Sequence, residues 1–223
     1  MLVSHDERQP IARLLTFLEH GERMAHDCAK AQASLSDDSG IRRFLLSQAG
    51  QEAMHARVFQ GAIVWLAPKR LGDAPFLPAL EDYRTILDDA LARRDLIETF
   101  LAEQVVLEGL GEAILTRIEQ GLAKRAAQFG RLRRILLHQE ESHHGFGRRQ
   151  LERAIERGET DVTDLNRRAQ RYLALTDAVV LTLCDLFERI DEDATAWARD
   201  VRTFLPEWLT QEPMADSQWH KQE

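Results

Sequence analysis

Residues 139–147 read Gln-Glu-Glu-Ser-His-His-Gly-Phe-Gly, and within them Glu140 and His143 stand three positions apart. Positions i and i+3 of a helix share a face, so this carboxylate and this imidazole can reach the same metal ion. A second Gln-Glu-x-x-His pattern spans residues 51–55 and relates Glu52 to His55 in the same way. Chance alone yields a single Glu-x-x-His match in a chain this rich in glutamate, so the paired arrangement carries the weight.

Each motif follows a predicted helix that has a carboxylate inside its apolar face. Glu22 lies 30 residues before Glu52, and Glu108 lies 32 residues before Glu140. A small residue, Ala or Gly, follows each of these earlier glutamates by three positions and would let a neighbouring helix approach closely. The order along the chain is therefore Glu, Glu-x-x-His, Glu, Glu-x-x-His on four successive helical regions, which predicts a ligand set inside a four-helix bundle.

Buried carboxylates are costly unless they are paired or bound to cations, and four of them in one core would repel each other. Two divalent cations would neutralise four carboxylates, and two neutral imidazoles would complete the ligand set. Oxygen and imidazole donors suit iron or manganese. We therefore expect two iron ions, with Mn/Fe or Mn/Mn pairs as alternatives, and six ligands: Glu22, Glu52, His55, Glu108, Glu140 and His143.

The second motif allows another register, because Glu141 and His144 also fit Glu-x-x-His. Their helical stripe would include Arg134 and Arg148, which indicates a face in contact with solvent. The stripe of Glu140 is flanked instead by leucine and glycine, so we predict that register. We expect His144 to be exposed or to support a ligand.

Two further glutamates compete with the predicted ligands. Glu19 shares its stripe with polar residues, so we prefer Glu22 on the first helix. Glu103 lies in an apolar setting like that of Glu108, and we exclude it on spacing rather than on burial. Whether these residues, together with Glu141, support the ligands remains open from the sequence.

Apolar spacing is helical along almost the whole chain and predicts an all-α protein. We expect a single domain over residues 1–209, with a four-helix core at about 10–157, one or two added helices at about 163–206, and a polar tail at 210–223. The expected core helices cover about 10–36, 41–66, 80–121 (broken near Asp95) and 124–157, and later helices cover 165–190 and 193–204.

Composition excludes several classes of protein. The net charge of −8 argues against a nucleic-acid surface. Cys28 and Cys184 are too few for a disulfide framework or a Cys₄ metal site. The sequence contains no long apolar run, so we expect no membrane span and a cytoplasmic location.

The residues resemble a known superfamily. Segment 139–147 resembles the Asp-Glu-x-x-His-x-x-Phe-Gly signature of non-haem di-iron proteins, with Gln139 in place of the Asp that often supports a metal-bound histidine. Residues 22–25, Glu-Arg-Met-Ala, resemble the Glu-x-x-Ala of rubrerythrins. The length and ligand order are most similar to those of the aldehyde-deformylating oxygenases. This resemblance implies a ferritin-like bundle, O₂ chemistry at a reduced dimetal centre, and an external electron donor.

Three functions follow as hypotheses. The first is an O₂-activating dimetal oxygenase or oxidase that acts on a small or long-chain apolar, lipid-like substrate through an apolar tunnel, with no catalytic residue beyond the metal ligands. The second is an iron-handling ferroxidase or a peroxide-scavenging protein. The third is a helical scaffold with a degraded site. We expect a monomer or homodimer, because the chain is long for a cage-forming ferritin subunit.

Overall fold

The computed structural model describes residues 4–67, 74–124, 130–189 and 193–210. Helix α1 (Arg8–Leu35) and helix α2 (Ser39–Leu66) form the first pair. The turn between them is short because Asp38 caps α2, where its carboxylate accepts hydrogen bonds from the backbone N–H groups of Gly40 and Ile41. Both helices agree with the sequence prediction.

The predicted third region consists of several segments: α3 (Leu77–Ala92), α4 (Leu96–Phe100), the π-helix η1 (Leu101–Leu107) and α5 (Glu108–Lys124). The expected break near Asp95 is confirmed. Arg94 adopts a positive φ of 59°, and the Asp95 side chain caps α4 by accepting from the N–H of Glu98. The π-helix was not predicted, and α5 continues three residues past the expected end at Gly121.

Helix α6 (Gly130–Glu156) carries the second motif and ends beside Gly158, whose φ of 69° suits glycine. After it come α7 (Val162–Leu181), α8 (Cys184–Arg189), α9 (Ala194–Phe204) and α10 (Glu207–Thr210). The predicted helix over 165–190 is therefore interrupted near Thr182. Helices α7 and α9 correspond to the two added helices that were predicted, and the described residues add the short segments α8 and α10. From residue 211 onward, the predicted tail lies outside the described residues.

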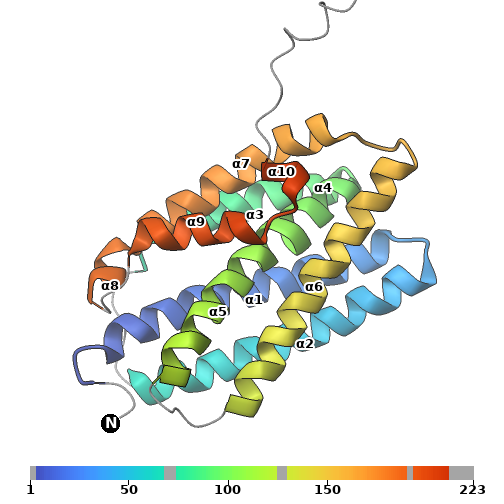
Figure 1. Cartoon of the computed structure of the whole chain (residues 1–223). Helices are drawn as coiled ribbons and strands as arrows, with labels where there is room; N and C mark the ends of the chain where they lie inside the picture. Colours follow the sequence, from blue (N-terminus) through green and yellow to red (C-terminus); the bar gives the residue numbers. More distant parts are fainter. Residues whose placement is uncertain (1–3, 68–73, 125–129, 190–192, 211–223) are drawn as a thin grey trace, which may run out of the picture.

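Four helical stretches, namely α1, α2, α4–η1–α5 and α6, form the bundle, and α3, α7 and α9 pack against its outside (Figure 1). Helix α6 packs closely against η1 at Gly147. A Cβ placed on Gly147 would come within 2.4 Å of the Gln104 Cβ, so only glycine fits there. Within the described ranges the chain contains no strand, and none of the described helices is long and apolar enough to span a membrane.

Candidate metal centre

The structure brings the six predicted ligands together inside the bundle. Each of them is at most 8% exposed, and they come from α1, α2, the first residue of α5 and α6. Their donor atoms form two groups that could each hold a metal ion. The groups are Glu22, Glu52, His55 and Glu140, and Glu52, Glu108 and His143.

The first group is centred on the Nδ1 atom of His55. This nitrogen lies 3.0 Å from Glu52 Oε2, 3.0 Å from Glu140 Oε1 and 3.3 Å from Glu22 Oε2. Glu140 therefore lies with the histidine of the other motif, although the sequence favoured pairing it with His143. Three carboxylates and one imidazole nitrogen converge on one position.

The second group is centred on the Nδ1 atom of His143. It lies 2.8 Å from Glu52 Oε1 and 3.7 Å from Glu108 Oε1. Glu52 thus directs one carboxylate oxygen to each histidine and belongs to both groups. A carboxylate placed in this way can bridge two metal ions.

The outer nitrogens of the two histidines are held by the two motif glutamines. His55 Nε2 lies 2.8 Å from the Oε1 atom of Gln139, and His143 Nε2 lies 2.6 Å from the Oε1 atom of Gln51. An amide oxygen only accepts, so each Nε2 carries the donated hydrogen and each Nδ1 lone pair faces the carboxylates. Each motif therefore supports the histidine of the other, and Gln139 acts on His55 rather than on His143.

Several buried atoms at the centre lack hydrogen bonds among the described residues. They are both carboxylate oxygens of Glu52, Oε1 of Glu140 and Nδ1 of His143. Buried polar atoms are rarely left without a partner, and such atoms call for an explanation such as an ion. These four atoms belong to residues of the two donor groups, so the residues fit a pair of metal ions. Within the described part of the chain, Oε2 of Glu103 and Nε2 of His144 also lack a hydrogen bond, although neither residue belongs to a donor group.

The buried carboxylates and histidines of the two groups favour bound protons. Burial raises the pKa values of Glu22 and Glu140 well above the ordinary range. Burial opposes the charged form of His143, but the carboxylates of Glu108 and Glu52 outweigh it and raise its pKa to about 10. The pKa of His55 is raised in the same way. Burial also disfavours ionised Glu52, yet the adjacent histidines lower its pKa. Bound protons therefore offset part of the negative charge of the carboxylates, which bound metal ions would otherwise balance.

The competing residues have other partners. Glu19 is as buried as Glu22, at 8% exposed, but it pairs with Arg23 at 2.5 Å. Glu141 is exposed. His144 is buried and lies 2.8 Å from Glu112, outside both donor groups. Burial alone therefore fails to distinguish ligands from their neighbours, whereas contacts do.

Glu103, which the sequence excluded as a ligand, lies beside the second donor group. It is fully buried, and the Gln48 amide donates both to its Oε1 at 3.1 Å and to Glu108 Oε1 at 2.8 Å. Burial and the neighbouring Glu108 carboxylate raise the pKa of Glu103 well above its usual value. A π-helix places residues five apart in register, and this brings Glu103 beside Glu108. Among the described residues it supports a candidate ligand and belongs to neither donor group.

No family model and no curated protein matches the chain in sequence. Among solved structures, the chain is similar to one described as protein 19 with aldehyde deformylating oxidase activity from Synechococcus. The TM-score is 0.78, the sequence identity is 16%, and the match covers 94% of this chain and 92% of that chain. The chain has a ferritin-like fold. At this identity the likeness concerns the ferritin-like fold, and the activity must be argued from the site.

Proposed function

We propose that the protein is an O₂-activating oxygenase or oxidase with two iron ions, which takes electrons from an external donor and acts on an apolar substrate. One observation carries this proposal: Glu52 directs its two carboxylate oxygens to two separate histidines. Nothing in a helical scaffold requires a fully buried carboxylate between two imidazoles. A bridged pair of cations gives this arrangement a physical reason.

The proposed ligands divide between two ions. Glu22, His55 and Glu140 would hold one ion, Glu108 and His143 would hold the other, and Glu52 would join them. A bound iron pair would supply O₂ binding and electron transfer, chemistry that amino-acid side chains lack. The protein's own contribution is to present neutral histidines in one orientation, which the Gln51 and Gln139 amides fix.

An apolar substrate is supported by the aromatic side chains beside the second donor group. Phe44 and Phe146 stack at 3.9 Å between ring centroids, and Phe44 meets His143 edge-on at 6.3 Å. Phe100 packs edge-on against Phe146 at 5.8 Å. These rings exclude water from that side of the site, and apolar groups are favoured there. The similar Synechococcus protein is described as having aldehyde deformylating oxidase activity, which is of the same general kind.

The proposal is tested by comparing Glu52→Gln with Glu141→Gln. Both variants replace one carboxylate of the same charge on a motif helix, but Glu141 is exposed and Glu52 is fully buried. We expect about two iron ions per chain in the unmodified protein and in Glu141→Gln, with O₂ consumed after anaerobic reduction. Glu52→Gln should lose bound iron and O₂ consumption together. Full iron binding by Glu52→Gln would contradict the proposal.

The substrate class has its own measurement. Reduced, iron-loaded protein is mixed with O₂ in the presence and absence of medium- and long-chain aldehydes, alcohols and hydrocarbons, and the products are analysed by mass spectrometry. An oxygenase or oxidase should give a product from at least one apolar compound. Turnover of free ferrous ion or hydrogen peroxide without any such product would indicate the iron-oxidising or peroxide-scavenging function instead.

A further inference from the structure

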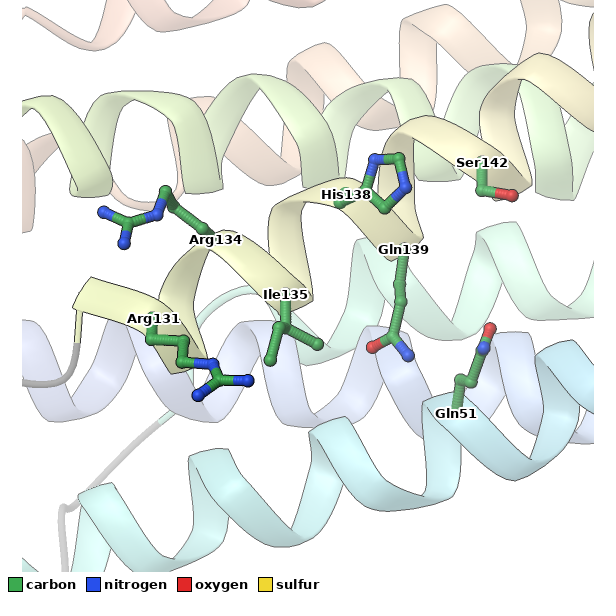
Figure 2. A pocket seen from close by; sticks show the side chains of 7 residues that line it. All are labelled: Gln51, Arg131, Arg134, Ile135, His138, Gln139 and Ser142. Atoms are coloured by element: carbon green, nitrogen blue, oxygen red, sulfur yellow. The ribbon is translucent and has the colours of Figure 1, made fainter.

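A pocket of about 570 Å³ lies between α2 and α6, directly outside the candidate metal centre. Gln139 from α6 and Gln51 from α2 extend toward one another across this space (Figure 2). Arg131, Arg134 and His138 of α6 also line it.

The pocket comes within one side chain of both proposed histidine ligands. Its lining glutamines accept hydrogen bonds from His55 and His143, at 2.8 Å and 2.6 Å. A molecule in the pocket would therefore be separated from either histidine by a single amide group. On the side of Phe44, the contact with His143 is between aromatic rings and is not a hydrogen bond.

The outer surface of α2 and α6, in which the pocket lies, has a charge opposite in sign to the net charge of the whole chain. Helix α2 contains three arginines and one acidic residue, Glu52, which is buried in the site. Helix α6 contains six arginines, of which Arg133 pairs with Glu119 on α5, and four glutamates, of which Glu140 is also buried. The chain as a whole has a net charge of −8. The outer surface of these two helices is therefore basic on an acidic protein, which favours an acidic partner.

Within the pocket, the basic groups remain available. Arg131 and Arg134 are exposed, and in the part of the chain that the structure describes neither has a carboxylate within ion-pair distance. His138 lies 3.4 Å from Glu141, and both side chains are largely exposed. Ile135, at 44% exposed, adds one apolar contact at the pocket. Unpaired cations around an exposed apolar side chain suit an acidic protein surface better than an apolar substrate.

We propose that this pocket is the docking site of an acidic one-electron carrier protein, which reduces the metal pair through the Gln139–His55 and Gln51–His143 contacts. This inference rests on the proposed function. In each encounter the carrier would give up one electron, which a bound ferric ion would accept, so two encounters would supply the two electrons that a diferric pair needs. Arg131 and Arg134 bind the carrier and take no part in the chemistry.

The test uses oxidised, iron-loaded protein and a reduced plant-type [2Fe–2S] ferredoxin as the acidic probe. Stopped-flow spectroscopy without O₂ follows oxidation of the ferredoxin as iron is reduced. Arg131→Glu combined with Arg134→Glu is compared with Arg148→Glu combined with Arg149→Glu, which makes the same charge change at exposed positions farther along α6. Reduced methyl viologen, a small cation, serves as the second reductant, and thermal unfolding verifies that each variant is folded.

The pocket variant should react with ferredoxin at least about tenfold more slowly, and the control variant should stay within about twofold of the unmodified protein. Added salt should slow the unmodified protein and remove the difference between variants. The rate of reduction by methyl viologen should not fall in either variant, because methyl viologen is a cation and the introduced glutamates attract it, whereas they repel the acidic ferredoxin.

Equal ferredoxin rates in the two variants would overturn the docking site. Inhibition by inorganic phosphate far beyond that by chloride at equal ionic strength would also overturn it, because the pocket would then hold a small anion. These failures differ from failure of the proposed function. In that case the protein would bind no iron pair, or methyl viologen would not reduce it in any variant.

Discussion

The His55 half and the His143 half of the site have nearly the same chemistry. In each half a Glu-x-x-His motif presents one Nδ1 atom to the carboxylates, and a glutamine from the opposite motif holds the Nε2 atom. Glu52 joins the halves through its two oxygens. The donor sets differ by one carboxylate, since three carboxylates face His55 and two face His143.

Their backbones differ strongly. The His55 half takes Glu22, Glu52 and His55 from α1 and α2, two uninterrupted α-helices of 28 residues each, and Glu140 from α6. The His143 half depends on η1, a π-helix that ends immediately before Glu108, and on a contact between Gly147 and Gln104 that leaves no room for a side chain. It also contains an additional buried carboxylate, Glu103. Similar donor sets can therefore be held by different backbone structures, and the His143 half is under the greater steric and electrostatic constraint.

The largest expected effect comes from removing one terminal carboxylate from either half. Glu22→Ala should retain the ion of the His143 half, and Glu108→Ala should retain the ion of the His55 half, so that each variant binds about one iron per chain. Iron analysis after gel filtration measures this stoichiometry. If Glu22→Ala lost all its iron while Glu108→Ala kept half, the His143 half could not bind an ion without its neighbour.

The glutamine contacts should have the next largest effect. Gln51→Leu and Gln139→Leu each remove the acceptor of one histidine N–H, and loss of such an outer contact weakens metal affinity about 10- to 100-fold. Competition with a chromophoric chelator measures the affinity of each ion. Gln51→Leu should weaken the ion at His143, and Gln139→Leu should weaken the ion at His55. Affinities that stay within about twofold in both variants would show that the amides do not support the histidines.

A smaller effect on stability distinguishes the two backbones. Gly147→Ala places a Cβ 2.4 Å from the Gln104 Cβ and should destabilise the protein by about 1–3 kcal/mol. Gly50→Ala, in the middle of α2, meets nothing within 4 Å and should be neutral or stabilising by up to about 1 kcal/mol. Urea unfolding of the metal-free variants provides both values. Equal values for the two variants would contradict the tight η1–α6 contact.

The final prediction is a dependence of stability on pH in the metal-free protein. His143 has a pKa of about 10 in the fold, against an ordinary value of 6.5. Between these values the folded state holds a proton that the unfolded chain has lost, so stability should fall as pH rises from about 6.5 to 10. Thermal unfolding across this range should show the decline. It should be weaker in His143→Gln, unchanged in His138→Gln, and absent from iron-loaded protein, in which the proton is displaced.

Most of the regular half could be predicted from the sequence, and less of the other half could. Apolar spacing predicted α1 and α2, and the burial stripes selected Glu22 and Glu140 over their neighbours. The π-helix has no comparable signal, because the expected helices assume 3.6 residues per turn. Glu103 was excluded on its spacing along the chain, since Glu108 more closely repeats the separation of Glu22 from Glu52. A buried carboxylate five residues before a proposed ligand is the signal that could have revealed it.

The glutamine contacts show a second limit of sequence reasoning. In the resembling family an Asp at the position of Gln139 often supports a metal-bound histidine, and its replacement by Gln argued against such support for His143. No sequence signal pointed to His55, because that contact depends on how α2 and α6 lie against each other. The structure assigns Gln139 to His55 and Gln51 to His143. The basic face outside these contacts was also hidden, since the net charge of the whole chain has the opposite sign.

The central claim, that Glu52 joins two metal ions, is tested most directly by crystallography of the iron-loaded protein with anomalous scattering at the iron edge. We expect two iron peaks per chain, about 3.5–4 Å apart, with one carboxylate oxygen of Glu52 directed to each. The Nδ1 atoms of His55 and His143 should also be ligands. A single peak, or two peaks that do not share Glu52, would contradict it.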